Sequence, residues 1–339
     1  MGSLWDDLEG LVNSPVSSSA QNGHRGTIKP KANFDAKEDA AALKEAIEGF
    51  GTNEKVLIEI LTQRSNAQRQ LICKAYEKET GRTLEKDLKG DTGGDFEDLL
   101  VALITPPAAF DCHEVIRAMK GAGTKEKILI EIFASRTNQQ IRAIQEVFLK
   151  EEEKKLTDEL ESDVSGDLSK ALLILAGAER DEDNSVNVEK AKQDAETLYK
   201  AGEKKWGTDE SKFIEILCRR SIPQLRQTFF EYLNISGKTL QQSIEGEMSG
   251  ELEELLVAIV KCAKSLPVYF AELLHESMKG GGTHESTLTR ILVSRSEIDL
   301  LDIRAEFKKL YEESLFSALD SDVGGEYGDC IKAICGGDD

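Results

Sequence analysis

A short phrase of glycine and threonine that recurs four times constrains this chain of 339 residues more than any other feature. The glycine directly before the threonine is Gly51, Gly123, Gly207 and Gly282 in the successive copies. An arginine follows each threonine by twelve residues, and an acid follows each glycine by forty. These partners are Arg64, Arg136, Arg220 and Arg295, and Asp91, Asp163, Glu247 and Asp322. Because chance does not hold two intervals fixed across four copies, the chain consists largely of four repeats of roughly 70 residues.

Apolar residues inside the first copy recur with the period of an α-helix. The residues that share one helical face are Val56, Leu57, Ile60 and Leu61. Alternating strand patterns are absent, and only six prolines occur in the whole sequence. Each repeat is therefore predicted to hold about five short helices, and the fold class is predicted to be all-α. In the first copy the helices are expected at Asp39–Ile47, Val56–Leu61, Asn66–Tyr76, Thr83–Leu88 and Glu97–Leu103.

Two segments lie outside the repeats. The first 32 residues are rich in Ser, Asn and Gly and are predicted to form a flexible tail. Ala178–Asn187 is a charged connector, which predicts that the repeats pair as 1 with 2 and 3 with 4. The predicted segments are a tail at 1–32, repeat 1 at 33–104, repeat 2 at 105–176, a linker at 177–188, repeat 3 at 189–263 and repeat 4 at 264–339.

The overall charge limits the partners that the protein can attract at long range. Lys and Arg number 43 against 63 Asp and Glu, which gives a formal net charge of −20. A chain this acidic repels phosphate, so nucleic acid is excluded as a partner held by broad electrostatic attraction. No apolar run approaches the roughly 20 residues of a membrane-spanning helix, and the acidic N-terminus lacks a signal-peptide core. We expect a cytoplasmic protein that is a monomer in solution.

Catalytic and zinc sites find no support in the sequence. The six cysteines and four histidines show no zinc-ligand spacing, and the cysteines are expected to be buried free thiols. Cys112 and His113 are adjacent, so they would point apart on a helix, and no third catalytic group accompanies them. We therefore expect a protein that is not an enzyme.

The second copy shows what the glycines, the threonine and the distant acid can do together. Glycine permits positive φ and has no Cβ, so the carbonyl oxygens of Gly121–Gly123 can turn toward one point. Thr124 is predicted to cap the helix that follows. Several carbonyls and the single carboxylate of Asp163 suit Ca²⁺, a hard cation that prefers oxygen. Phosphate binding by loop N–H groups is the rival interpretation, but the shared acid would repel phosphate and no copy has a Walker lysine.

Such a loop leaves a calcium ion short of its six to eight oxygen ligands. At a membrane, lipid phosphate or carboxylate oxygens would fill the open positions, so that the ion joins two negative partners. One loop should bind weakly, but four loops acting together gain through effective concentration. The predicted function is calcium-dependent binding to anionic phospholipid membranes, to which the cytoplasmic protein moves when calcium rises.

Three alternatives stay open at this stage. The repeated acids could instead cap helices, an interpretation as good as calcium for one copy but weaker for four. The protein could be a helical scaffold whose main partners are proteins. It could also conduct ions if charged residues such as Glu131 and Arg136 line an axis between the repeats, although buried ion pairs explain these residues equally well. The repeated arginines are expected to be structural, bonding carbonyls or a carboxylate within each repeat.

These motifs resemble the annexin family over about residues 33–339. Three loops have the full G-x-G-T pattern, and the third copy reads Lys205-Trp206-Gly207-Thr208 instead. The resemblance implies a slightly curved disc of four five-helix repeats, with calcium loops on the convex face that meet phospholipid. Three stretches are similar to one particular branch of the family: Arg64–Gln70, Ser296–Asp302 and Ile334–Asp339.

The resemblance also implies the metal ligands, residue by residue. The acids would bind through their side chains and all other ligands through backbone carbonyls. The implied ligands are Ile47, Gly49, Gly51 and Asp91 in repeat 1; Met119, Gly121, Gly123 and Asp163 in repeat 2; Gly202, Lys205, Gly207 and Glu247 in repeat 3; and Met278, Gly280, Gly282 and Asp322 in repeat 4.

Several positions depart from the family pattern. Glu48 stands where the family often has lysine, which removes a basic residue that could touch lipid headgroups. Lys125 and His284 replace the usual acid after threonine, which argues against secondary calcium ions beside those loops. Thr52 and Glu54 retain a secondary metal site in repeat 1.

Two groups of apolar residues outside the predicted metal ligands are expected to contact a membrane or a protein surface. Trp206 lies inside the third loop and is predicted to insert at the lipid interface, with packing on its own repeat as the alternative. In the tail, an amphipathic helical stripe consists of Leu4, Trp5, Leu8, Leu11 and Val12. This helix could enter the groove of an EF-hand protein, but docking of Trp5 on the protein's own core is the preferred expectation.

Overall fold

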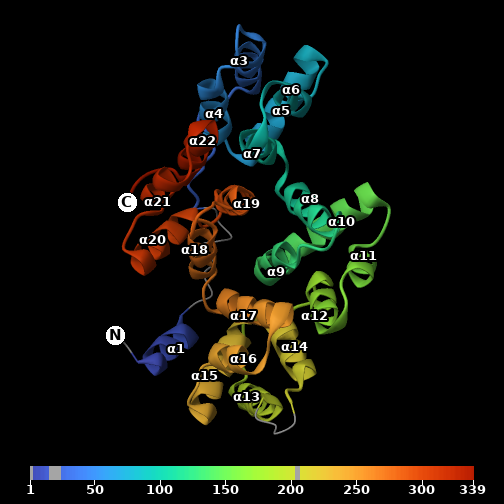
Figure 1. Cartoon of the computed structure of the whole chain (residues 1–339), viewed down its shortest axis with the longest axis vertical. Coiled ribbons are helices and arrows are strands. Elements are labelled where there is room, and N and C mark those ends of the chain that lie inside the picture. The colour runs from blue at the N-terminus through green and yellow to red at the C-terminus, as the bar shows by residue number, and fades with distance from the viewer. Residues whose placement is uncertain (1–2, 15–23, 203–206) are drawn as a thin grey trace. The chain divides into compact units, whose positions relative to one another are not determined.

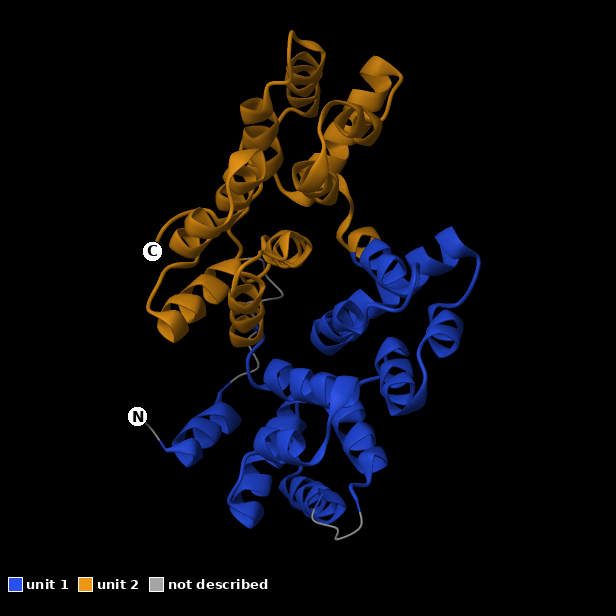
Figure 2. Cartoon of the chain, in the orientation of Figure 1, with its two compact units in different colours: residues 1–16, 111–266 blue, residues 17–110, 267–339 orange. Residues whose placement is uncertain are grey.

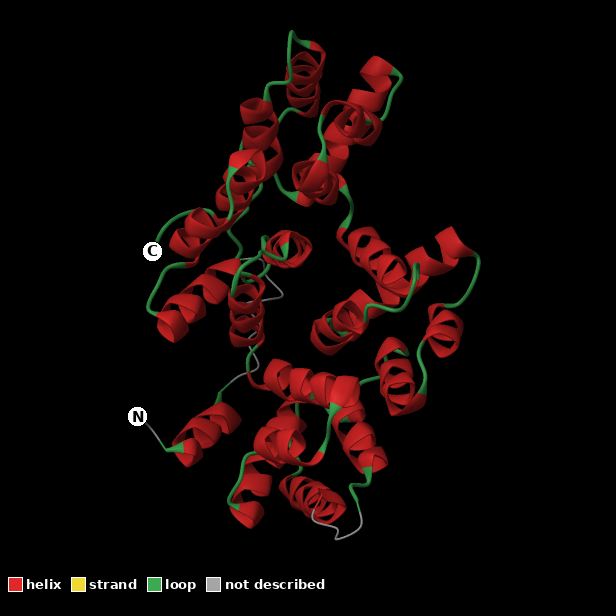
Figure 3. Ribbon diagram, in the orientation of Figure 1, coloured by secondary structure: helices red, strands yellow, loops and turns green. Residues whose placement is uncertain are grey.

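The computed structural model describes residues 3–14, 24–202 and 207–339 (Figure 1). These residues form 21 helices and no strand (Figure 3), which confirms the predicted all-α class. None of the described helices combines the length and the apolar character that crossing a bilayer requires. One helix near the N-terminus, α1 (Leu4–Asn13), precedes four successive sets of five helices.

Repeats 1 and 2 keep the same order of helices, and each helix predicted for the first copy overlaps an observed one. The helices of repeat 1 are α3 (Ala36–Glu48), α4 (Glu54–Thr62), α5 (Asn66–Thr80), α6 (Leu84–Asp91) and α7 (Gly94–Ile104). Those of repeat 2 are α8 (Pro107–Met119), α9 (Glu126–Ser135), α10 (Asn138–Glu152), α11 (Leu156–Asp163) and α12 (Gly166–Ala176).

Repeats 3 and 4 follow the same order, and the fourth helix has 8 residues in all four repeats. The helices of repeat 3 are α13 (Val188–Gly202), α14 (Glu210–Arg219), α15 (Ile222–Ser236), α16 (Leu240–Glu247) and α17 (Gly250–Lys264). Those of repeat 4 are α18 (Leu266–Ser277), α19 (Glu285–Arg295), α20 (Leu300–Tyr311), α21 (Leu315–Asp322) and α22 (Gly325–Cys335).

The repeated arginines form ion pairs inside their own repeats, as the sequence predicts. These pairs are buried in repeats 1, 2 and 4, whereas Arg220 in repeat 3 is half-buried. In repeats 1 to 3 the partner is an aspartate from the first helix of the same repeat. The Nε–Oδ2 distances are 2.7 Å for Arg64–Asp39, 2.8 Å for Arg136–Asp111 and 2.8 Å for Arg220–Asp194. Each guanidinium also donates a second hydrogen bond to the same carboxylate. Such bidentate pairing fixes the first helix of each repeat against the turn that follows the second helix.

The fourth repeat keeps its arginine but changes the partner. Phe270 occupies the place of the aspartate on the first helix, and the guanidinium of Arg295 lies 4.8 Å from the centre of its ring. Arg295 pairs instead with both carboxylate oxygens of Asp299, at 2.8 Å each. In repeat 1 the third helix begins two residues after the arginine, whereas α20 begins at Leu300, five residues after Arg295. The carboxylate that binds the arginine thus occupies the turn where the helix would otherwise start.

The described residues fall into two compact units (Figure 2). Unit 1 draws on residues 1–16 and 111–266, and unit 2 on residues 17–110 and 267–339. In unit 1, helices of repeats 2 and 3 pack together, α9 and α12 against α17. In unit 2, helices of repeats 1 and 4 pack together, α4 and α7 against α22. The predicted pairing of repeat 1 with 2 and of 3 with 4 is therefore wrong, because apolar helix faces and not the charged connector decide which repeats pack.

The connector itself is hydrogen-bonded to the third repeat. Arg180 donates from Nη1 to the carbonyls of Leu217 and Arg220, at 2.8 Å each. The backbone N–H of Asp181 donates to the carbonyl of Arg219 at 3.0 Å. These bonds satisfy carbonyls at the C-terminal end of α14, so the connector closes this helix end as well as linking two repeats.

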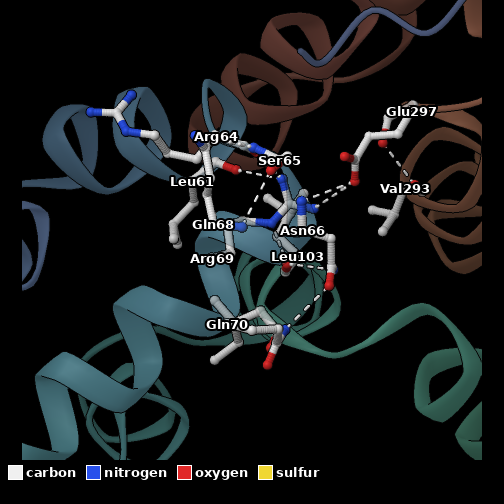
Figure 4. Close-up of polar contacts among 12 residues, drawn as sticks. Leu61, Arg64, Ser65, Asn66, Gln68, Arg69, Gln70, Leu103, Val293 and Glu297 are labelled. Atoms are coloured by element: carbon white, nitrogen blue, oxygen red, sulfur yellow. Dashed lines mark hydrogen bonds and ion pairs between the residues drawn. The ribbon is translucent and has the colours of Figure 1, made fainter. Parts of the chain in front are cut away.

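Within unit 2, a polar cluster joins repeats 1 and 4 (Figure 4). Glu297 accepts a hydrogen bond of 3.0 Å from the backbone N–H of Asn66, at the start of α5, and lies 3.8 Å from Arg69. Arg69 also donates from Nε to the carbonyl of Leu103 at 2.5 Å. Burial lowers the pKa of the Arg69 guanidinium to about 10, and the carboxylate of Glu297 opposes that shift. A buried cation thus fastens α5 to the end of α7 and to the neighbouring repeat.

Within unit 1, the N-terminal helix α1 lies against α15. Ser3 and Asp6 form a capping box at its start. The Trp5 ring meets the Phe230 ring edge-on, with 6.5 Å between the ring centres, and Leu8 is only 5% exposed. Leu8, in the middle of the predicted apolar stripe, is therefore buried on repeat 3 of the same chain, whereas Leu4 and Trp5 stay 49% and 40% exposed.

Within unit 2, residues 25–28 run along repeat 4. The backbone N–H of Ile28 donates to the carbonyl of Ser296 at 3.0 Å, and the carbonyl of Arg25 accepts from Leu301 at 2.9 Å. Thr27 donates from its hydroxyl to the carbonyl of Ile334 at 2.7 Å. The end of the segment that the sequence analysis assigned to the tail is thus hydrogen-bonded to repeat 4.

Candidate metal-binding loops

The loop between the first and second helices has the same closing hydrogen bond in every repeat. The residue after the threonine donates its backbone N–H to a carbonyl near the end of the first helix. The pairs are Asn53 to Ala46 at 2.9 Å, Lys125 to Ala118 at 2.8 Å, Asp209 to Ala201 at 3.0 Å and His284 to Ser277 at 2.9 Å. The third pair spans one residue more than the others, so the third loop carries an additional residue.

The second loop shows why glycine is needed before the threonine. Gly123 has φ of 106°, a region that residues with a Cβ rarely adopt. Gly121, Gly123 and the residue between them are exposed, whereas the side chain of Met119 is buried. The loop can therefore offer its backbone oxygens to an ion while the chain before it packs in the core.

The repeated acids stand at an unfavourable place for a purely structural carboxylate. Each is the last residue of the fourth helix of its repeat: Asp91, Asp163, Glu247 and Asp322. The N-cap of the next helix lies two residues further on, so these acids are not N-caps. A negative charge at a helix C-terminus opposes the helix dipole, which disfavours it by several tenths of a kcal/mol. A cation in the adjoining loop would reverse that balance.

The threonines bring these distant acids beside the loops. Thr124 donates from Oγ1 to the carbonyl of Asp163 at 3.3 Å. Thr208 donates to the carbonyl of Glu247 at 3.4 Å, and Thr283 donates to the carboxylate of Asp322. In repeat 1 both Thr52 and Asp91 are described, and these two make no such bond.

The predicted role of Thr124 as a helix cap is wrong. The N-cap of α9 is Lys125, which makes no side-chain capping bond. The closing hydrogen bond at Lys125 delays the start of the helix by one residue. The hydroxyl of Thr124 is thereby left to reach the end of α11 instead of the first turn of α9.

The third loop contacts its acid directly. A Cβ placed on Gly202 would lie 2.3 Å from Oε2 of Glu247, so a larger residue at this position would displace the carboxylate from where it now lies. The other predicted ligands of this loop are Gly207, which is exposed, and Lys205. Lys205 and the predicted membrane contact Trp206 lie outside the described residues.

The remaining predicted ligands have the exposure that a backbone role requires. Ile47 is buried, so only its carbonyl is available, and Met278 is half-buried. The exposed glycines of the first and fourth loops are Gly49, Gly51, Gly280 and Gly282. The predicted secondary site, Thr52 and Glu54, is half-buried beside the N-cap Asn53.

This donor set fits calcium better than it fits a transition metal. No group of three or more His, Cys, Asp or Glu residues that could hold a metal occurs in the described part of the chain. Each predicted ligand set combines backbone carbonyls with a single carboxylate, and these would be hard oxygen ligands.

The sequence did not reveal an ion pair of reversed sign beside the first loop. Lys120 before the second loop pairs with Glu152 at 2.9 Å. In the first repeat the signs are reversed, because Glu48 pairs with Arg82 at 2.5 Å. Arg82 donates hydrogen bonds to the carboxylates of Glu48 and Asp87. Both bonds raise the pKa of the guanidinium, and the bond to Glu48 has the larger effect. A basic group, Arg82, therefore lies beside the first loop although residue 48 is an acid. In the sequence, only the acid at position 48 indicates that a basic partner is needed.

The four repeats match the sequence pattern of one family, described as annexin, at residues 38–103, 110–175, 193–259 and 269–334. The chain belongs to the annexin family. Annexins are membrane-binding proteins, in general not enzymes, that bind phospholipid in a calcium-dependent way. Calcium is accordingly the ion that this annexin binds.

Individual relatives agree with the branch that the three sequence stretches indicate. The chain is 56% identical to human annexin A3 over 317 residues, which cover 94% of this chain and 98% of the relative. The solved structure of annexin III superposes with a TM-score of 0.91 at 56% identity and covers 94% of this chain and 98% of the other. Calcium-bound annexin (Sm)1 superposes with a TM-score of 0.83 at 35% identity, covering 96% and 99% of the two chains.

Proposed function

We propose that this annexin binds anionic phospholipid membranes through its four glycine-threonine loops when calcium is present. The observation that carries this proposal is the position of the repeated acid, which ends the fourth helix of its repeat beside the loop. In repeats 2 to 4 the loop threonine donates a hydrogen bond to this acid. The bound ion would supply positive charge and open coordination positions for lipid phosphate or carboxylate oxygens.

The proposed ligands act in the same way in each repeat. The carboxylates of Asp91, Asp163, Glu247 and Asp322 bind the ion, and the remaining ligands contribute backbone carbonyls. These are Ile47, Gly49 and Gly51; Met119, Gly121 and Gly123; Gly202, Lys205 and Gly207; and Met278, Gly280 and Gly282. Thr52 and Glu54 form a secondary site. The exposed glycines and the buried side chains of Ile47 and Met119 support this assignment.

Local charge, not the charge of the whole chain, drives the association. Four divalent ions neutralise less than half of the net charge of −20. The protein therefore approaches an anionic membrane against a weak long-range repulsion, which salt screens beyond about 10 Å. Short-range coordination at the loops overcomes this repulsion, and several loops acting together strengthen it.

We further propose a peripheral, non-catalytic role for a cytoplasmic monomer. Trp206 would insert at the lipid interface from the third loop, which is one residue longer in sequence than the others. Helix α1 would stay docked on α15, and its contacts there argue against constant exposure to an EF-hand partner.

Vesicle sedimentation tests the proposed function. Phosphatidylserine vesicles should sediment the protein when calcium is present and release it when a chelator is added. Phosphatidylcholine vesicles serve as the control and should retain little protein. Retention without calcium would favour a scaffold, a conductance across planar bilayers would favour an ion conductor, and no retention would overturn the proposal.

Replacement of the acids tests the ligand assignment. Asp163→Asn and Asp322→Asn each keep the shape of the side chain but remove the charge, so the calcium needed for half-maximal sedimentation should rise about tenfold. Glu161→Gln is the matched control, since Glu161 is exposed on the same helix as Asp163. Unchanged calcium dependence in both aspartate variants, with intact helical circular dichroism, would refute the assignment.

A further inference from the structure

Phe50 is the most exposed large apolar side chain in the described part of the chain. Its relative exposure is 114%, whereas the next in order, Leu149, is 53% exposed. A phenylalanine that contributes to folding would bury most of its ring. Phe50 contributes nothing of this kind, so the folded chain holds it out in water.

The loop holds Phe50 in place at both ends. Gly49 donates its backbone N–H to the carbonyl of Glu45 at 3.0 Å, and Asn53 donates to Ala46 at 2.9 Å. The ion pair between Glu48 and Arg82 fixes the chain immediately before the glycine. Phe50 therefore stands at the tip of a closed loop, between two proposed calcium ligands.

The first loop differs from the second and fourth loops in the size of the residue at its tip. The residue between the two glycines is Ala122 in the second loop and Gly281 in the fourth. Neither offers a bulky apolar group, although both are exposed. A large apolar side chain is thus a property of the first loop among the three that the structure describes completely.

We propose that Phe50 inserts into the bilayer when the first loop binds to an anionic membrane. This inference rests on the proposed function and adds an apolar contact to its ionic ones. A membrane can accept one isolated ring, because the lipid surrounds whatever enters it. A protein partner would need a wider apolar patch with a polar rim. The exposed neighbours of Phe50 are instead Glu48, Gly49, Gly51 and Asn53.

Truncation of the ring and its transfer to another loop test the proposal. Phe50→Ala should weaken calcium-dependent partitioning onto phosphatidylserine vesicles about tenfold, the effect of moving most of one aromatic ring out of water. Ala122→Phe should strengthen partitioning by a similar factor. Leu71→Ala is the control, since Leu71 is exposed on α5 of the same repeat, and it should leave partitioning unchanged.

A depth measurement makes the insertion visible. In a variant with Trp5→Phe and Trp206→Phe, Phe50→Trp places the only tryptophan at the loop tip. Lipids brominated on their acyl chains should quench its fluorescence when calcium is present, and a chelator should reverse the quenching.

The outcomes separate this inference from the proposed function. Normal sedimentation of Phe50→Ala, or an unquenched tryptophan on sedimented protein, would overturn the insertion and leave calcium-dependent binding intact. Equal weakening in Leu71→Ala would also overturn it. If the natural protein does not sediment with calcium at all, both proposals fail together.

Discussion

At the scale of single residues, the repeated arginine keeps its position while its partner changes. Asp39, Asp111 and Asp194 pair with it in three repeats. In the fourth, Phe270 lies under the guanidinium and Asp299 supplies the charge from the following turn. A buried guanidinium needs a carboxylate, but the chain can supply that group from either side.

The buried pairs should matter far more than exposed ones. Asp39→Ala leaves Arg64 buried without its carboxylate and should destabilise the fold by about 3–5 kcal/mol. Glu85→Ala removes the exposed pair with Lys89, whose N–O distance is 2.7 Å, and should cost less than about 1 kcal/mol. Urea unfolding followed by circular dichroism compares the two variants. Similar midpoints would contradict the structural role of the arginines.

Buried thiols predict a loss of stability at alkaline pH. Burial raises the pKa of Cys112 and of Cys218 to about 12, from the ordinary value of 9.0. The folded state keeps these protons while an unfolded chain releases them. Their contribution is therefore complete below about pH 9 and is lost as the pH rises toward 12. Between about pH 9.5 and 11 the free energy of unfolding falls as the pH rises. Cys112→Ala should make this fall less steep by about 1.4 kcal/mol per pH unit. An unchanged slope in urea unfolding would contradict this.

At the scale of elements, the threonine joins two segments that the sequence places forty residues apart. The loop after α8 and the end of α11 meet through the hydroxyl of Thr124. The sequence spacing indicated that these segments belong together, but it did not show which atoms meet. A hydroxyl can cap its own helix or reach another element, and only the fold decides between the two.

This tie should position the second calcium site. Thr124→Val keeps the shape of the side chain and removes the hydrogen bond, so calcium affinity should fall about three- to tenfold. Thr197→Val is the control, because the hydroxyl of Thr197 bonds to Gln193 within α13. Isothermal titration with calcium in the absence of lipid measures both variants. Equal affinities would show that the tie is dispensable.

At the scale of the whole molecule, the acidic charge predicts an unusual response to salt. Proteins held to anionic polymers by many basic residues lose about 10³–10⁵ in affinity between 50 and 200 mM salt. This annexin has a net charge of −20, so salt screens a repulsion instead of an attraction. At fixed calcium, its vesicle affinity should change by less than about tenfold over that range, measured by sedimentation. A steep loss would point to a basic surface as the membrane contact.

The sequence alone determined the four repeats, the all-α class and the positions of the glycine-threonine loops. Those features depend on spacing and periodicity along the chain, which neighbouring residues encode directly. The caps, such as Ser65 with Gln68, are equally local. The third copy was recognised as different, although its additional residue became visible only through the bond from Asp209 to Ala201.

Only the tertiary structure decided which repeats pack together and which charged side chains pair beside the first loop. Repeat 1 packs with repeat 4, and Glu48 finds Arg82, because apolar helix faces associate wherever their combined burial is greatest. That free energy depends on all the faces at once, so no interval in the sequence records it. The exposure of Phe50 has the same origin, since a side chain is exposed only when no other part of the chain covers it.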